Sequence, residues 1–272
     1  MTAQNQTQIE LWNGRAGDTW VELQDSLDRM LAPVTDALAA RVGSVAGKRI
    51  LDIGCGTGVT CKRWIDGGAD VTGVDVSAPM LAAARERAKG RARLMQADAS
   101  VWQGDAPFDF AVSQFGVMFF DDAEAAFANI AANLRPGGRL VFACWRPHTE
   151  NPWVTVPMGA VRGLIDLPPV EPHAPGPFGL ADAMRTRGVL DQAGFTDITI
   201  DPVDFAYVIA GGLEEAVRFM MQIGPTARAL AEADKDVKAA AAERLAGALA
   251  AYERNGSVTF PGAIWIVEAR RT

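Results

Sequence analysis

The sequence predicts an α/β fold built on a doubly wound parallel sheet. From Arg49 onward, short runs that favour β-strands alternate with stretches of helical periodicity. Because parallel neighbours in a sheet need crossover segments, and these are usually helices, the alternation itself indicates a parallel sheet. A glycine-rich turn at residues 54–58 lies between the first strand and the helix that follows it. This placement predicts a ligand site at the end of the first strand.

The elements of this pattern can be followed along the first half of the chain. Apolar residues recur with helical spacing over residues 26–42, and Gly43 can end that helix. Ser77 is placed to cap a helix that begins with Ala78 and Pro79, and another helix covers 123–134. A tight turn follows at Arg135-Pro136-Gly137-Gly138. The predicted strands are 49–53, 70–74, 92–96, 108–113 and 139–143.

The second half of the chain has a different composition. Eight prolines lie between Pro147 and Pro177, too many for regular elements, so we predict a long connection over the surface or over a site. Helical and strand patterns then resume, and Gly194 can end the first helix. The plainer interpretation of the apolar stripe in the last helix is core packing. The predicted elements are helices at 181–193, 213–223 and 237–252, and strands at 196–208 and 263–269.

Composition excludes several classes of function. The 272 residues include 26 Lys and Arg against 33 Asp and Glu, a net charge of −7 without a dense basic cluster, so we expect no nucleic acid partner. The three cysteines lack CxxC spacing, which argues against a zinc site or a disulfide framework and fits a reduced, cytoplasmic setting. The chain has no apolar run of membrane-spanning length and no leader pattern at Met1–Glu10, so we expect no membrane partner.

The strongest local signal is the segment Leu51-Asp52-Ile53-Gly54-Cys55-Gly56-Thr57-Gly58. Glycines let the chain turn tightly and let a ligand approach the backbone, and the next helix offers free N–H groups. The glycine spacing is G-x-G-x-G, whereas the dinucleotide fingerprint would need glycine at Val59. A nucleotide-like ligand is therefore predicted here, and hydride transfer by a nicotinamide dinucleotide is disfavoured.

Two carboxylates follow the next two predicted strands. Asp75 comes 19 residues after Gly56 at the tip of the second strand, where it can accept hydrogen bonds from both hydroxyls of a ribose. Asp98 follows the third strand and can accept from the exocyclic amine of adenine, with the backbone near Ala99 close to the ring nitrogens. The alternatives are a surface turn for Asp75 and a helix cap for Asp98.

With these motifs in order, the chain from Arg49 to Trp145 resembles class I S-adenosylmethionine-dependent methyltransferases. Within them it is most similar to bacterial small-molecule enzymes related to the ubiquinone/menaquinone-biosynthesis type. Further matches to a bacterial subgroup of unassigned substrates lie at 12–21, 115–120 and 144–153. The resemblance implies S-adenosyl-L-methionine as cofactor, S-adenosyl-L-homocysteine as product and a small-molecule acceptor. It leaves open the acceptor, the atom methylated and the oligomeric state.

The resemblance also implies an architecture. It gives a seven-stranded, mostly parallel sheet with an antiparallel last strand and helices on both faces. This chain departs from the family's minimal fold, in which a hairpin joins the last two strands, because a helical insertion of about two helices precedes the last strand here. The implied segments are an N-terminal helical cover for the cofactor site at 1–47, a cofactor-binding core at 48–146, a proline-rich connection at 147–180 and a C-terminal part of the core at 181–272. The insertion, at about 211–257, is predicted to cover the substrate, with edge packing as the alternative.

The resemblance and the chemistry together give a set of candidate residues. The cofactor-binding candidates are Trp20, Asp52, Gly54, Cys55, Gly56, Gly58, Asp75, Val76, Met80, Ala97, Asp98, Ala99, Gln114 and Phe115. The substrate-binding candidates, near the ends of the fourth and fifth strands, are Trp145, Arg146, Asn151 and Trp153. No metal ligand set is predicted.

A general base is predicted only for an acceptor that arrives protonated, and His148 is the candidate because it follows the fifth strand. The other histidine, His173, lies in the proline-rich connection. Both could equally be solvated loop residues, and Arg146 could be an ordinary ion-pair partner. Two alternatives to methyl transfer stay open: an NAD(P)-dependent oxidoreductase and a non-catalytic S-adenosylmethionine-binding protein.

Overall fold

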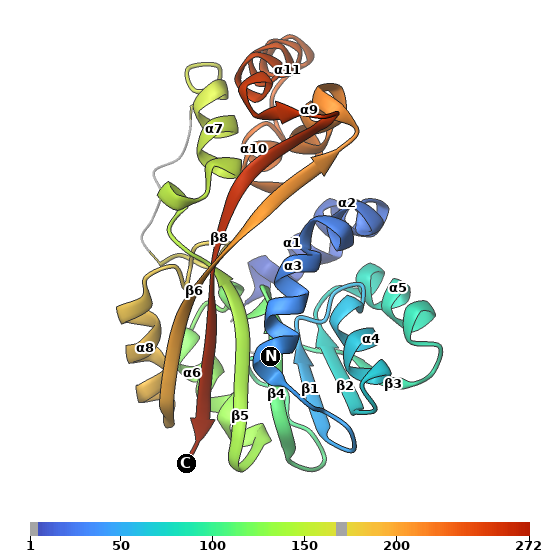
Figure 1. Cartoon of the computed structure of the whole chain (residues 1–272), viewed down its shortest axis with the longest axis vertical. Coiled ribbons are helices and arrows are strands. Elements are labelled where there is room, and N and C mark those ends of the chain that lie inside the picture. Colours follow the sequence, from blue (N-terminus) through green and yellow to red (C-terminus); the bar gives the residue numbers. More distant parts are fainter. Residues whose placement is uncertain (1–4, 167–172) are drawn as a thin grey trace.

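A single twisted sheet forms the centre of the molecule (Figure 1). The computed structural model describes residues 5–166 and 173–272. Seven strands follow the order β3-β2-β1-β4-β5-β8-β6, and a two-residue strand, β7, pairs with β8. The strands are β1 Arg49–Ile53, β2 Asp70–Asp75, β3 Ala92–Gln96, β4 Phe108–Gln114, β5 Leu134–Trp145, β6 Phe195–Ala210, β7 Glu253–Arg254 and β8 Ser257–Arg271.

The pairing directions confirm the predicted sheet. Strand β1 pairs in parallel with both β2 and β4, β3 is parallel to β2, and β5 is parallel to β4. Strand β8 is antiparallel to β5 and to β6, as the resemblance implied. The chain leaves β1 toward β2 and β3 on one side and then crosses back to β4 on the other side of β1, so the carboxyl ends of β1 and β4 form the switch point where open α/β sheets bind ligands.

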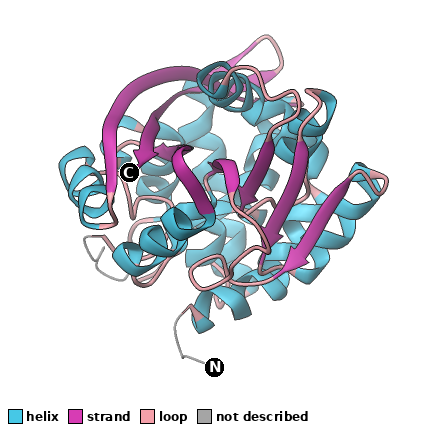
Figure 2. Ribbon diagram, turned by 90° about the horizontal axis from the view of Figure 1, so that it is seen from below, coloured by secondary structure: helices cyan, strands magenta, loops and turns pink. Residues whose placement is uncertain are grey.

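Helices cover both faces of the sheet (Figure 2). Helices α3, α4 and α5 form one contacting layer, and α6 and α8 contact each other on the other face. Two short helices, α1 and α2, precede α3. The helices are α1 Gln6–Asn13, α2 Arg15–Glu22, α3 Gln24–Val42, α4 Val59–Asp66, α5 Ala78–Ala88, α6 Ala123–Asn133, α7 Pro152–Val161, α8 Ala183–Gln192, α9 Gly212–Gln222, α10 Gly224–Ala229 and α11 Lys235–Leu249.

Local signals account for where the core helices begin. Ser77 caps α5 by accepting from the Met80 N–H at 3.4 Å, as predicted, and Pro79 lies in the first turn where no N–H is needed. Asp122 caps α6 by accepting from the Ala125 N–H at 2.9 Å. In the described part of the chain, no helix is both long enough and apolar enough to cross a membrane.

The prediction that the proline-rich connection lacks regular elements is wrong for its first half. Residues Pro152–Val161 form α7, with Pro152 in the first turn and Pro157 buried inside the helix. Proline is tolerated at a helix start, and burial of Trp153, Val154, Pro157 and Val161 offsets the bond lost at Pro157. Part of the second half of the predicted connection, residues 167–172, lies outside the described residues.

Strands β6 and β8 are longer than predicted and extend beyond the sheet. Their antiparallel pairing continues from Phe195 opposite Arg271 to Ala210 opposite Ser257. Around their far ends lie α7, α9, α10 and α11, which we call the helical lobe (Figure 1). Buried Val161, Leu230, Ala241 and Leu245 form its own small core. The predicted two-helix insertion thus has a third helix, α10, between the other two.

Candidate functional site

The glycine turn lies at the end of β1 and has the backbone that only glycine adopts readily. Gly54, Gly56 and Gly58 have φ of 62°, 54° and 83°, in the left-handed region. A Cβ on Gly54 would lie 2.7 Å from the Cα of Gly116, so the turn packs directly against the segment after β4. A Cβ on Gly56 would meet only the end of the Met80 side chain, at 3.0 Å. Gly58 precedes α4 as its N-cap.

A cavity adjoins this turn, which we call the glycine-turn cavity. Seven of the predicted cofactor-binding residues line it: Trp20, Gly54, Cys55, Gly56, Met80, Gln114 and Phe115. Six lining residues were not among the candidates: Leu27, Asp28, Leu31, Thr57, Val59 and Thr60. The helical stripe of α3 signalled that Leu27 and Leu31 face inward, but no sequence pattern pointed to Asp28. The structure therefore adds the amino-terminal half of α3 to the site.

Asp28 brings a carboxylate to the cavity wall. Its Oδ2 pairs with Arg87 of α5 at 2.7 Å, and the two side chains are 25% and 17% exposed. Burial raises the pKa of Asp28, and the Arg87 charge opposes that rise. Arg87 also donates to Gln24 Oε1 at 3.0 Å, which ties the start of α3 to α5. The carboxylate on this wall of the cavity is therefore already paired with a cation of the protein itself.

Asp75, at the tip of β2, faces the glycine turn. Its Oδ2 accepts from the Gly56 N–H at 2.8 Å and its Oδ1 from the Ser77 N–H at 2.8 Å. Burial raises the pKa of this carboxyl, and these two backbone donors oppose the rise. The contacts fix the carboxylate beside Gly56. Its role with a ribose stays a prediction.

The other candidates near β2 and β3 lie outside the cavity wall, beneath α1. Val76 uses its carbonyl to accept from Asn13 Nδ2 at 2.9 Å, and the Ala97 N–H donates to the Asp75 carbonyl at 3.0 Å. Asp98 Oδ1 accepts from the Ser100 N–H at 2.9 Å, and the Ala99 carbonyl accepts from Asn129 Nδ2 at 3.0 Å. The cofactor-binding candidates thus form two adjoining groups. One group lines the glycine-turn cavity, and the other lies outside the cavity wall near α1.

Asp52 is fully buried behind the glycine turn and does not line the cavity. Burial raises its pKa to about 7, and the nearby Asp75 charge adds to the rise. Thr60, Cys61 and Trp64 on α4 lie close enough to oppose it, yet within the described residues no hydrogen bond of regular geometry reaches either oxygen. As a direct cofactor ligand, Asp52 stays a prediction that its position does not favour.

The predicted substrate residues belong to an aromatic cluster next to Phe115. The Trp145 ring stacks on Phe115 with centroids 4.6 Å apart, and Trp153 lies 4.7 Å from Trp145. Trp153 also stacks on Tyr207 of β6 at 5.0 Å, a residue that sequence reasoning missed. Burial raises the pKa of Tyr207, so its hydroxyl stays protonated. The cluster continues the wall that Phe115 begins at the cavity.

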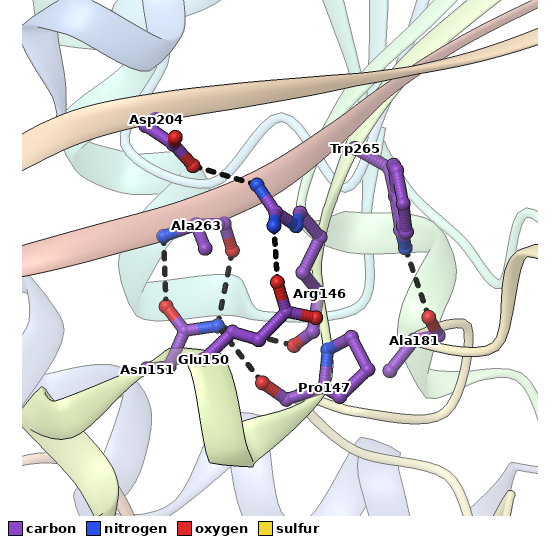
Figure 3. A network of polar contacts seen from close by, with 8 residues as sticks. All are labelled: Arg146, Pro147, Glu150, Asn151, Ala181, Asp204, Ala263 and Trp265. Atoms are coloured by element: carbon purple, nitrogen blue, oxygen red, sulfur yellow. Dashed lines mark hydrogen bonds and ion pairs between the residues drawn. The ribbon is translucent and has the colours of Figure 1, made fainter.

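Two further substrate candidates belong to a polar network, which we call the Asn151 frame (Figure 3). The fully buried Asn151 donates to the carbonyls of Arg146, Pro147 and Ala263 at 3.0–3.3 Å. Its Oδ1 accepts from the Ala263 N–H and from Trp153 Nε1, both at 3.0 Å. All polar atoms of its amide are therefore used within the protein, and acceptor binding by Asn151 stays a prediction that these contacts do not favour.

Arg146 has carboxylate partners of its own. It pairs with Asp204 of β6 at 2.6 Å and with Glu150, and its guanidinium lies 5.3 Å from the Trp265 ring centroid. Figure 3 shows the side chain directed at these two acids. The alternative of an ordinary ion-pair partner accounts for these contacts, and binding of an acceptor carboxylate stays a prediction.

The two histidines lie on exposed turns. His148 is in a single 3-10 turn, His148–Glu150, directly after β5, and its ring meets Phe178 edge to face at 5.9 Å. His173 is exposed and has φ of 66°. The structure thus places His148 near the aromatic cluster through Phe178, which itself lies 6.4 Å from Trp153. A base role for His148 is compatible with this position but stays a prediction.

Comparison with known families identifies the region that contains the glycine turn, Asp75 and Asp98. Residues 50–138 match the model of a methyltransferase domain. The central part of this chain is thus similar to a methyltransferase domain. The predicted resemblance to class I methyltransferases is therefore confirmed for these residues, and the domain accounts for β1 to β4, α4 to α6 and the start of β5.

Curated relatives match part of this chain. A malonyl-[acyl-carrier protein] O-methyltransferase of Enterobacter lignolyticus is 40% identical over 130 residues, which are 43% of this chain and 51% of the relative. A demethylmenaquinone methyltransferase of Renibacterium salmoninarum is 33% identical over 116 residues, 42% of this chain and 48% of the relative. The chain thus spans about half the length of these relatives.

A solved structure extends the likeness to the whole fold. The magnesium protoporphyrin IX methyltransferase of Synechocystis PCC 6803, crystallised with bound S-adenosylhomocysteine, superposes with a TM-score of 0.58. The match covers 98% of this chain and 99% of that enzyme at 15% identity. At that identity the likeness establishes the fold and leaves the substrate open.

Proposed function

We propose that this protein transfers a methyl group from S-adenosylmethionine to a small organic acceptor and releases S-adenosylhomocysteine. One observation carries the proposal: the glycine-turn cavity lies at the switch point of the sheet, and most of its lining residues belong to the segment that matches a methyltransferase domain. Asp75 ends β2, the strand beside β1, and Asp98 follows β3, the next strand of the sheet, so both lie at the carboxyl edge of the sheet. They adjoin the glycine turn and support a nucleoside end for the ligand there.

The residues present fit this cofactor. The cavity has apolar walls at Leu27, Leu31 and Met80, an exposed backbone at the glycine turn and a carboxylate at Asp28. These apolar, backbone and carboxylate groups are kinds of group that an elongated ligand with a positive charge, an apolar middle and a nucleoside end would contact. When bound, the cofactor supplies a methyl group that its positively charged sulfur has already activated for transfer.

The protein then has to orient the acceptor and exclude water, and no covalent nucleophile is required. Phe115 and Trp145 form a stacked wall between the cavity and the aromatic cluster. Phe115 has φ of 67°, unusual for a residue that is not glycine, and its N–H donates to the Ala143 carbonyl at 3.0 Å. Such a held conformation is common at functional sites and supports a role for Phe115 in shaping the site.

The acceptor belongs to the proposal as a class only. Trp145, Trp153 and Tyr207 are buried aromatic residues beside the cavity, which supports an acceptor with an apolar or aromatic body. The relatives' names span a carrier-bound malonyl group and demethylmenaquinone. We therefore infer a small organic acceptor, and a carrier-bound acyl group is one arm of the test.

Titration calorimetry followed by a turnover assay tests the proposal. We expect S-adenosylmethionine and S-adenosylhomocysteine to bind, and NAD and NADP not to bind. Turnover is then measured with labelled methyl donor against free carboxylic acids, quinols, phenols and malonyl groups on a carrier protein. Binding of NAD alone would favour the oxidoreductase, and cofactor binding without turnover of any acceptor would favour a non-catalytic binding protein.

A base role for His148 gives a second prediction. If His148 removes the acceptor proton, His148→Ala lowers kcat by about 10²- to 10⁴-fold and leaves cofactor affinity unchanged. The matched control is His173→Ala, the other exposed histidine, which we expect to keep wild-type kcat. Wild-type turnover and an unchanged pH profile for His148→Ala would leave orientation of the acceptor as the source of the rate.

A further inference from the structure

Asn5, at the start of α1, makes contacts that its local position does not explain. It stands at the N-cap of α1, yet its side chain makes no capping hydrogen bond. Asn at an N-cap usually serves that local role, which stabilises a helix end. Instead the side chain reaches residues that are 93 and 116 positions away in the chain. The residue is 4% exposed and has φ of 59°, a conformation that Asn tolerates better than most residues.

The carboxylate of Asp98 is the main partner of this side chain. Asn5 Nδ2 donates to Asp98 Oδ1 at 3.0 Å and to Oδ2 at 2.9 Å, and also to Ser100 Oγ at 3.1 Å. The Oδ1 atom of Asp98 additionally accepts from the Ser100 N–H. In the described part of the chain, Oδ2 has Asn5 as its hydrogen-bond donor, so this oxygen keeps a lone pair for one more donor.

The other side of Asn5 is bound equally firmly. Its Oδ1 accepts from the Asp121 N–H at 2.8 Å, and its own N–H donates to Asp121 Oδ2 at 2.6 Å. A backbone N–H can only donate, so this contact fixes which end of the amide is oxygen. Asn5 therefore joins the end of β3 to the segment after β4, and it holds Asp98 in one orientation.

The rest of α1 approaches the neighbouring strand end. Asn13 Nδ2 donates to the Val76 carbonyl at 2.9 Å, its Oδ1 accepts from the Ala78 N–H at 3.0 Å, and Ser77 Oγ donates to the Trp12 carbonyl at 2.7 Å. Helix α1 thus contacts the segment that follows Asp75, and Asn5 at its start contacts Asp98. These are the two carboxylates predicted to bind the nucleoside end of the cofactor.

We propose that Asn5 is a positioning residue for adenine recognition: it aims the Asp98 carboxylate so that the free lone pair of Oδ2 accepts from the exocyclic amine of the cofactor. This inference rests on the proposed function. It makes α1 part of the nucleoside site. The preference for adenine then depends on Asn5 together with Asp98, which lies 93 positions away in the chain. A buried amide that holds a carboxylate is effective because a misdirected carboxylate loses a charge-assisted hydrogen bond.

The test compares two ligands that differ at the amine. S-adenosylhomocysteine carries the exocyclic amine, whereas S-inosylhomocysteine has an oxygen in its place and cannot donate there. We expect the wild-type protein to prefer the adenosyl ligand by roughly 10- to 100-fold in Kd, the range for a hydrogen bond to a charged group. We expect Asn5→Ala to reduce this preference to about threefold or less while binding of the inosyl ligand changes little.

Matched variants separate positioning from folding. Gln6→Ala removes the neighbouring amide, which donates to Glu10 at 2.8 Å on the same helix, and should keep the full adenosyl preference. Asn5→Asp keeps the side-chain volume and the acceptor for the Asp121 N–H but loses the donor to Asp98, so it should lose the preference like Asn5→Ala. This second variant also provides the comparison if Asn5→Ala does not fold.

Three outcomes have distinct meanings. Absence of binding of either ligand to the wild-type protein would overturn the proposed function, and the inference with it. Adenosyl binding with an undiminished preference in both Asn5 variants would overturn the inference alone. Tighter adenosyl binding in Asn5→Ala would also overturn it, because it would show that Asn5 competes with adenine for Asp98.

Discussion

The glycine-turn cavity lies at the carboxyl ends of β1 and β4, and the Asn151 frame lies beside the carboxyl end of β5. The two regions differ in how completely their buried polar groups are hydrogen-bonded. Around the cavity, Asp28 and Asp75 are partly buried carboxylates whose pKa values burial raises, and Asp52 lies behind the turn without a regular hydrogen bond. In the frame, Asn151 uses its amide completely.

We interpret the cavity region as suited to ligand binding and the Asn151 frame as structural support for the fold. Buried polar groups cost free energy unless they are paired, so a region with incompletely paired carboxylates is less stable than it could be. The region of the glycine turn has this free-energy cost, and a ligand bound in the adjoining cavity can offset it. In the frame the amide of Asn151 is fully paired, and among the frame's described residues Arg146 Nε alone is buried without a partner. The frame joins β5, β8 and α7 where the helical lobe meets the sheet. The following predictions test this contrast.

The largest effect is expected from the pH dependence of Asp52. Its folded pKa of about 7 lies above its ordinary 3.8, so the folded state binds a proton more tightly than the unfolded state. The free energy of unfolding therefore falls as pH rises from about 4 to about 7, by about 4 kcal/mol at most, and stays low above that range. Asp52→Asn removes this part of the pH dependence.

Urea unfolding of both proteins at pH 5 and pH 8 measures the effect. The wild-type protein should lose more stability between these two pH values than Asp52→Asn does. The raised pKa values of Asp28 and Asp75 act in the same direction in both proteins, so the difference between the proteins isolates Asp52. If both proteins lost the same stability between these pH values, the charged form of Asp52 would cost little free energy in the folded protein, contrary to the prediction.

An effect of comparable size is expected in the frame. Asn151→Ala leaves the Ala263 N–H and the Trp153 indole N–H buried without an acceptor, and we expect it to lower the free energy of unfolding by roughly 3–5 kcal/mol. Gln222→Ala, which removes an exposed amide on α9, should change it by less than about 0.5 kcal/mol. A small effect of Asn151→Ala would mean that the frame does not support the lobe.

A smaller effect is expected on ligand affinity at Asp75. Asp75→Ala should weaken S-adenosylmethionine binding by roughly 1.5–3 kcal/mol, the range for hydrogen bonds made by a charged group. Calorimetry measures the change, and Asp70→Ala is the control because Asp70 lies at the opposite, exposed end of β2. Unchanged affinity in Asp75→Ala would remove Asp75 from the ribose assignment.

The smallest effect is expected for Arg146. Its two acid partners are 80% and 39% exposed, so Arg146→Met should lower stability by only about 1 kcal/mol. If the ion pairs are its whole role, KM for an identified acceptor should stay within about threefold of wild type. A tenfold rise in KM with an unchanged kcat would instead support the predicted binding of an acceptor carboxylate.

The sequence predicted much of the core because the signals there are local. The strand at 92–96 and the helix that Ser77 caps follow from short-range periodicity and capping chemistry. The proline-rich segment was misjudged at 152–161 because proline disfavours a helix locally, whereas packing of α7 against α11 and β8 outweighs that preference.

The candidate site divides in the same way. The glycine spacing by itself determined where the cavity lies, since left-handed backbone at Gly54, Gly56 and Gly58 is a local requirement. Only the tertiary structure decided that Asp28 lines the cavity, that Asn5 holds Asp98 and that Asn151 closes the frame. Each of these joins residues from separate elements, and no local periodicity encodes which buried polar group will meet which partner once the chain has packed.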